Sequence, residues 1–295
     1  MSSGSFDIAP ADVFDAQAHI WADETPDRPW QPEWFTRAHR FPALGADELL
    51  GMMDRAGVGR AVLVQPSWAG DDNDVVLEAA ERHPDRFTVM ARIPPDEAAG
   101  APLLAELAQH PAVAGVRLTF HRPEMQAWLV DGTTDWLWSA LVEHDQAAMV
   151  YAPGRNAELR RIALAEPALR LAVDTLGLTL TMRDEEIDAP IRDLDVFADV
   201  PNVVVKATAL PGYVSDPYPY RSLAPRLRRL FDVLGRDRVF WASDLTRVPH
   251  PYRDITTFAA DLGVLTDDEL RAFMGGGLAA WLAPRPVVPT HSDNR

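Results

Sequence analysis

Hydrophobic and polar positions along the chain follow two alternating patterns. Eight short runs rich in Val, Ile, Leu and Phe predict β-strands, and most are followed by a segment with apolar residues at helical spacing. Runs such as 61–64 and 203–205 are apolar throughout, which is typical of parallel strands covered on their outer face. The predicted strands are 13–20, 60–66, 87–93, 113–120, 147–152, 169–175, 202–208 and 238–243. The predicted helices are 47–56, 74–83, 103–110, 136–143, 158–165, 191–197, 223–234 and 252–262.

Eight strand–helix repeats within about 250 residues predict an α/β fold of the (β/α)8 TIM-barrel type. A doubly wound open sheet is the alternative, but no Gly-x-Gly-x-x-Gly follows the first predicted strand to support its nucleotide-binding form. We expect a single barrel domain over residues 1–283. The Pro- and Trp-rich insertion 26–42 should lie over the barrel mouth. Segment 267–282 should form a last helix, broken by the glycines at 275–277, and 284–295 a disordered tail.

Composition narrows the classes of partner. The formal charge is 28 − 44 = −16, so the surface should repel nucleic acids and anionic membranes. The chain has no cysteine, which excludes disulfides, thiolate nucleophiles and Cys-ligated metal centres. Residues 1–6 lack the basic and apolar regions of a signal peptide, and no apolar run approaches the roughly 20 residues that span a bilayer. We therefore expect a soluble, cytoplasmic protein.

In a TIM barrel the active site lies at the carboxyl ends of the strands. Polar residues predicted at those ends are therefore the candidates for chemistry. They are Gln17, His19, Gln65, Arg92, Arg117, Thr119, Tyr151, Asp174, Thr175, Lys206, Thr208, Ser243 and Asp244.

Five short motifs in strand order resemble the amidohydrolase superfamily, specifically its amidohydrolase-2 branch of TIM-barrel hydrolases, lactonases and decarboxylases. Phe-Asp-Ala-Gln-Ala-His-Ile-Trp at 14–21 is similar to the family's Asp-x-His-x-His strand, and Arg-Pro-Trp at 28–30 to the insertion that follows it. Gly-Val-Arg-Leu, Val-Asp-Thr-Leu-Gly and Val-Val-Lys-Ala resemble its fourth, sixth and seventh strands. Trp-Ala-Ser-Asp-Leu resembles the eighth, whose aspartate is the family's general base and corresponds here to Asp244.

The departures from this family pattern concentrate at its metal positions. Gln17, Tyr151 and Thr175 stand where the family has histidines, whereas His19 and Asp244 remain. Catalytic zinc sites generally use three protein ligands, and amide or hydroxyl groups replace imidazole poorly. We therefore expect no tightly bound metal. The alternative is one divalent metal such as zinc, held by His19 and Asp244.

The resemblance implies roles for the remaining groups. A lactonase subgroup of this superfamily works without metal, and by analogy Asp244 would activate water while His19 polarises the carbonyl. Arg117 and Lys206 could anchor a substrate carboxylate. The structural alternatives are a capping or turn role for Asp244, a buried and satisfied His19, and ion pairs of Lys206 and Arg117 with Asp174 or Asp244. Further candidate substrate contacts are Gln17, Tyr151, Thr175, His121 and Arg155.

The sequence therefore predicts a hydrolase that opens a lactone or similar cyclic ester on a small-molecule, possibly carboxylate, substrate. Two alternatives stay open. One is a lyase, cyclase or decarboxylase that uses the same acid and base groups. The other is a barrel that binds a small molecule without turnover. The resemblance also implies a homodimer.

Overall fold

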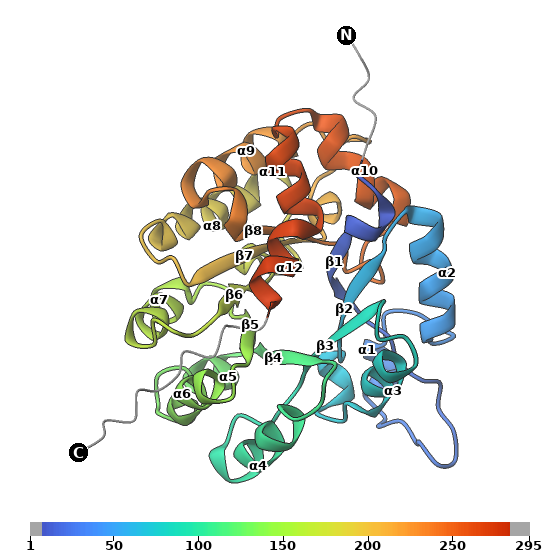
Figure 1. The fold of residues 1–295 in the computed structure, drawn as a ribbon, viewed down its shortest axis with the longest axis vertical. Coiled ribbons are helices and arrows are strands. Elements are labelled where there is room, and N and C mark those ends of the chain that lie inside the picture. The colour runs from blue at the N-terminus through green and yellow to red at the C-terminus, as the bar shows by residue number, and fades with distance from the viewer. Residues whose placement is uncertain (1–7, 284–295) are drawn as a thin grey trace, which may run out of the picture.

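The computed structural model describes residues 8–283, in which eight parallel strands pair in sequence order as a barrel surrounded by helices (Figure 1). The predicted TIM barrel is therefore confirmed, with every predicted strand in place. The strands are β1 Phe14–Ala18, β2 Arg60–Val64, β3 Phe87–Ala91, β4 Val113–Thr119, β5 Ala147–Tyr151, β6 Leu171–Val173, β7 Val203–Thr208 and β8 Val239–Ala242.

The helices lie outside this sheet, and all eight predicted helical segments are present. Helix α4 begins earlier than predicted, because the side chain of Asp96 caps it by accepting a hydrogen bond from the amide of Ala99 at 3.0 Å, and Pro102 is accommodated inside it. The short α1 and α5 were not predicted. The α-helices are α1 Trp34–Arg37, α2 Ala46–Ala56, α3 Asp74–Arg82, α4 Glu97–Leu107, α5 Pro123–Ala127, α6 Asp135–Glu143, α7 Asn156–Ala165, α8 Asp188–Asp193, α9 Leu223–Leu234, α10 Tyr252–Leu262, α11 Asp267–Arg271 and α12 Gly277–Leu282.

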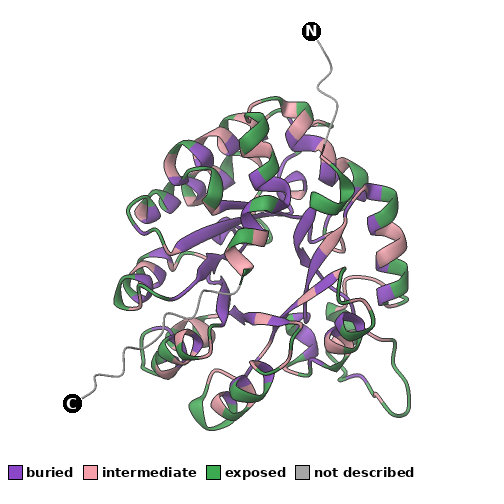
Figure 2. Ribbon diagram, in the orientation of Figure 1, coloured by how far each residue is buried: buried purple, intermediate pink, exposed green. Residues whose placement is uncertain are grey.

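Apolar side chains form one core inside the barrel and another between the barrel and its helices. Buried residues accordingly cover the strands and the inner faces of the helices, while the outer helix faces are exposed (Figure 2). Helix α12 packs against the inner core through Leu278 and Trp281, and Figure 1 shows it across one end of the barrel. A π-helical segment, Ala272–Gly276, precedes it, and there a Cβ at Gly275 would lie 2.2 Å from the carbonyl oxygen of Asp12. The predicted last helix, interrupted at its glycines, is thus confirmed.

A buried carboxylate joins β8 to β1 and positions the site. Asp15 accepts hydrogen bonds from the amide of Ser243 at 2.8 Å, from the Ser243 hydroxyl, and from the Tyr252 hydroxyl at 2.7 Å. The amide of Asp244 donates to the carbonyl of Gln17 at 3.0 Å. Burial raises the pKa of Asp15 despite these hydrogen bonds. The end of β8 is therefore fixed against the end of β1, where His19 follows.

The insertion after β1 reaches the barrel mouth, as predicted. Its Trp30 contacts Trp68, with ring centroids 5.8 Å apart, and His39 lies beside Trp21 at 5.7 Å. No helix within residues 8–283 combines the length and hydrophobicity needed to cross a membrane. The predicted tail 284–295 lies outside the described residues.

Candidate active site

The carboxyl ends of the strands surround a cavity of about 70 Å³. Nine of the side chains singled out in the sequence line it together, although they come from six different strands or the loops that follow them. They are Gln17, His19, Gln65, Arg117, Thr119, His121, Tyr151, Thr175 and Asp244. The sequence therefore identified most of this surface.

His19 is held in a single hydrogen-bonding state. Its Nδ1 lies 2.7 Å from the carbonyl oxygen of Val64, which can only accept, so Nδ1 carries the proton. Burial lowers the pKa of His19 to about 3, so the ring is neutral at physiological pH. Its Nε2 consequently presents a lone pair to the cavity rather than an N–H.

Gln17 places its side-chain amide between Lys206 and His19. Lys206 donates to the Gln17 Oε1 at 2.8 Å, which turns the amide NH₂ toward Nε2 of His19, at 3.4 Å. Because an ammonium group can only donate, the amide cannot be reversed without losing this hydrogen bond. Lys206 is the only lysine of the chain, and it is fully buried.

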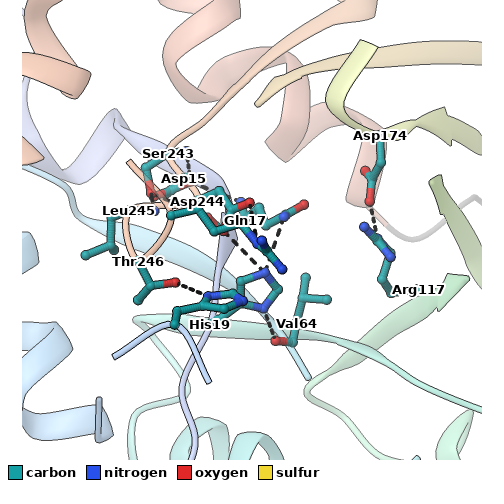
Figure 3. Close-up of polar contacts among 12 residues, drawn as sticks. Asp15, Gln17, His19, Val64, Arg117, Asp174, Ser243, Asp244, Leu245 and Thr246 are labelled. Carbon is teal, nitrogen blue, oxygen red and sulfur yellow. Dashed lines mark hydrogen bonds and ion pairs between the residues drawn. The ribbon is translucent and has the colours of Figure 1, made fainter. Parts of the chain in front are cut away.

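Asp244 faces the same lone pair. Its Oδ1 lies 3.4 Å from Nε2 of His19, and within residues 8–283 no hydrogen-bond donor reaches this buried oxygen (Figure 3). Burial raises the pKa of Asp244, although Arg247, whose Nε lies 3.9 Å from Oδ2, opposes the shift. Its backbone is left-handed, with φ 44°, a conformation that costs a non-glycine residue free energy and is often kept at functional sites. Two facing acceptors are most stable with a proton between them, so this pair is well placed to take up and release one.

A second buried carboxylate, Asp174, behaves differently. Lys206 lies 2.8 Å from its Oδ1. Nε of Arg117 donates to its Oδ2 (Figure 3). Burial alone would raise the pKa of Asp174, but the two cations together lower it below its ordinary value. The ion pairs considered in the sequence analysis as structural alternatives for Lys206 and Arg117 are therefore present. Lys206 does not line the cavity, whereas Arg117 does.

The other predicted contacts divide into two groups. Tyr151 and His121 stack with ring centroids 6.2 Å apart, and the Arg117 guanidinium lies 5.5 Å from the Tyr151 ring. Thr175 follows β6 in a left-handed turn, with φ 54°. Arg155, in contrast, is not among the cavity-lining residues, because its guanidinium is hydrogen-bonded to Gln126 and Glu158.

Two ionisable lining residues were not singled out from the sequence. His39, from the insertion, has Nδ1 at 2.7 Å from the Thr246 hydroxyl and a ring centroid 5.5 Å from that of His19. Burial lowers its pKa to about 3. Arg247 lies in the loop after β8. Its position three residues after Asp244 was a usable signal, since loops at the carboxyl ends of barrel strands form the active site.

The donor set does not fit a catalytic zinc ion. The carbonyl oxygen of Gln17 is turned to Lys206, and only its NH₂, which cannot bind a metal, faces His19. Nε2 of His19 and Oδ1 of Asp244 remain, one ligand fewer than such sites generally have. Among the described residues, no three His, Asp or Glu side chains lie close enough to share a metal ion.

Two characterised proteins that are similar in sequence to this chain are lactone hydrolases. The chain is 27% identical over 268 residues to 4-sulfomuconolactone hydrolase from Hydrogenophaga intermedia, covering 88% of this chain and 82% of the relative. It is 25% identical over 294 residues to L-fucono-1,5-lactonase from Burkholderia ambifaria, covering 95% and 98%.

Solved structures agree on the fold. An amidohydrolase from Burkholderia multivorans with bound zinc superposes with a TM-score of 0.75 at 20% identity, over 92% of this chain and 99% of the other. 5-Carboxyvanillate decarboxylase from Sphingomonas paucimobilis superposes with a TM-score of 0.60 at 16% identity, over 91% and 98%. A family model described as Amidohydrolase matches residues 14–277, almost the whole barrel. The chain therefore belongs to the amidohydrolase-2 branch of the amidohydrolase superfamily.

Proposed function

We propose that this protein opens a lactone ring with a water molecule activated by Asp244. The observation that carries the proposal is the Oδ1 of Asp244, which is buried, lacks a hydrogen-bond donor within residues 8–283, and faces the lone pair of His19 across 3.4 Å. A lactone ring is also what the names of the two curated relatives share, a sulfomuconolactone in one and a fuconolactone in the other.

The proposed reaction balances without a cofactor. Asp244 takes a proton from water as the water oxygen adds to the lactone carbonyl carbon, giving a tetrahedral oxyanion. Collapse of this intermediate breaks the bond between the carbonyl carbon and the ring oxygen. The departing oxygen then takes the proton back from Asp244, and the product is a hydroxy acid. Nε2 of His19 shares the proton while it resides on Asp244.

Arginine cations, rather than His19, stabilise the oxyanion in this proposal. With Nδ1 committed to Val64, neutral His19 has no N–H to offer at Nε2, so it cannot donate to an oxyanion. Arg117 and Arg247 both line the cavity. Arg117 is oriented by Asp174, which is the kind of fixed donor that oxyanion stabilisation requires.

Product analysis tests the reaction type. Five- and six-membered lactones, including the two named for the relatives, are incubated in isotopically labelled water. We expect one labelled oxygen in the carboxylate of the product. Consumption of substrate without label, or release of CO₂, would instead indicate a lyase or decarboxylase.

Metal independence is tested separately. His19 and Asp244 offer two metal ligands, whereas catalytic zinc sites generally use three. We therefore expect activity to survive dialysis against a chelator, and elemental analysis to find no stoichiometric metal. A bound metal whose removal abolishes turnover and whose return restores it would overturn this part of the proposal. Binding of lactones without turnover, unaffected by Asp244→Asn, would overturn the catalytic assignment itself.

A further inference from the structure

A second cavity, of about 330 Å³, adjoins the catalytic one and is lined by four arginines. Arg37 comes from α1, Arg92 from the end of β3, Arg122 from the segment before α5, and Arg247 from the loop after β8. Four elements far apart in sequence thus place their guanidinium groups around one space. We call it the arginine cavity. Its other lining residues are Ser67, Trp68, Thr119, His121 and Met125.

No described acidic side chain lines the arginine cavity, although the chain carries a net charge of −16. Arg92 meets Asp71 at 3.5 Å and Arg122 meets Glu124 at 4.0 Å, both looser than a hydrogen-bonded ion pair. Arg37 has no ion-pair partner within the described part of the chain. Arg247 likewise meets Asp244 only at 3.9 Å. Positive charge is therefore concentrated here and only loosely paired with acidic side chains.

The surrounding contacts hold this charge at the cavity wall. The Nε of Arg92 donates to the carbonyl of Gly70 and its terminal nitrogen to Thr119, both at 3.2 Å, and burial lowers the pKa of Arg92 to about 10, so it stays charged. Burial and then four arginines, Arg122 first, lower the pKa of His121. Neutral His121 can therefore serve as a hydrogen-bond partner for a ligand without adding to this charge.

The two cavities share part of their lining. Ser67, Thr119, His121 and Arg247 line both of them. The catalytic cavity, at about 70 Å³, has room for little more than the reacting ester group, whereas small-molecule sites usually exceed about 300 Å³. A substrate whose carbonyl reaches Asp244 therefore extends into the neighbouring space.

We propose that the arginine cavity binds a carboxylate or sulfonate group carried on the lactone ring, so that the preferred substrates are anionic lactones. This inference rests on the proposed function, because it assumes that the ester is hydrolysed at Asp244. The arginine cavity itself does not include Asp244. Planar guanidinium groups bind such oxyanions bidentately, which fixes the ring relative to the base as well as holding it.

Direct binding tests the site without turnover. Benzenesulfonate and the uncharged benzenesulfonamide are similar in shape, and both are titrated calorimetrically into the wild-type protein. We expect benzenesulfonate to bind preferentially, and Arg122→Gln or Arg37→Gln to weaken it about tenfold, the usual cost of one charged hydrogen bond. Arg82→Gln, on the exposed face of α3, is the matched control and should leave binding unchanged.

Kinetics then test whether anion binding in the arginine cavity contributes to hydrolysis of the lactone. A butenolide with a carboxymethyl substituent is compared with the unsubstituted ring; Arg122→Gln should raise KM about tenfold for the first only, and Arg122→Lys should restore most of it. Equal binding of the charged and neutral probes, or equal affinity in Arg122→Gln and Arg82→Gln, would overturn the arginine cavity as an anion site. Charge-dependent binding without turnover of any lactone would leave the anion site standing and overturn the proposed function instead.

Discussion

Asp244 and Asp174 are both buried at the barrel mouth, yet their environments have opposite effects. Asp174 has a cation on each carboxylate oxygen, Lys206 and Arg117, and its pKa is lowered. Asp244 has a neutral imidazole on one oxygen and an arginine only at 3.9 Å on the other, and its pKa is raised. Environments that move the pKa values of two similar groups apart commonly mark acid–base roles. The comparison therefore supports the proposal that Asp244 transfers the proton, while Asp174 carries a fixed charge.

Replacing the proposed base should give the largest effect. Asp244→Asn should lower kcat about a thousandfold, because an amide cannot take a proton from water. The fold should remain, since the new amide NH₂ can donate to the lone pair of His19. Steady-state kinetics with circular dichroism measure both, and Asp85→Asn, exposed in a loop, is the control. Turnover within tenfold of wild type would remove Asp244 from the mechanism.

Removing the Lys206 cation from Asp174 should lower the stability of the folded protein. Lys206→Met leaves Asp174 with Arg117 alone and deprives Gln17 of its donor. We expect a loss of about 3 kcal/mol in the free energy of unfolding, measured by urea denaturation. Asp174→Asn combined with Lys206→Met should cost less than the two single changes added together. Additive costs would mean that the pair is not coupled.

The orientation of Gln17 can be tested by giving it a charge. Gln17→Glu keeps an acceptor for Lys206 but presents a carboxylate oxygen, instead of NH₂, to Nε2 of His19. The pKa of His19, about 3 in the native protein, should rise by about two pH units, because a neighbouring carboxylate stabilises the protonated imidazole. NMR titration of the imidazole measures it. An unchanged pKa would show that Gln17 does not control the protonation of His19.

The smallest effect concerns the pH dependence of stability. Because the folded-state pKa of Asp244 is raised, its ionised form destabilises the folded protein at neutral pH. Asp244→Asn should therefore raise the free energy of unfolding there by about 1 kcal/mol, a typical gain when a strained functional group is removed. The gain should disappear as the pH falls below 3.8, where Asp244 is protonated in both states. A gain that persists in acid would have another cause.

The sequence predicted the barrel and much of the site because both follow from local pattern. Strand periodicity placed Gln17 and His19 at one strand end and Asp244 at another, and the fold brings all such ends together. His39 could not be found in this way, since it lies in an insertion without periodicity and its contact with His19 depends on how that insertion folds. Arg155 lies on a loop at the expected end of the barrel but does not reach the cavity, because Gln126 and Glu158 bind its guanidinium. Those contacts too depend on the folded arrangement of the loops.

The role of His19 also needed the structure. From sequence it was assigned as an electrophile, and only the contact between Nδ1 and the carbonyl of Val64, 45 residues away, identifies the tautomer. Likewise, the orientation of Gln17 depends on Lys206, which follows it by 189 residues. Such long-range hydrogen bonds decide which atom of a side chain faces the substrate, and periodicity does not report them.

The solitary lysine has a practical consequence. Since Lys206 is fully buried and no other residue of the chain has a side-chain primary amine, amine-acylating reagents should not reach a lysine until the barrel opens. Mass spectrometry of the peptide that contains Lys206 would then record, against time, how often the interior beneath the active site becomes exposed to solvent. The residue that fixes Gln17 is thus also a built-in reporter of barrel opening.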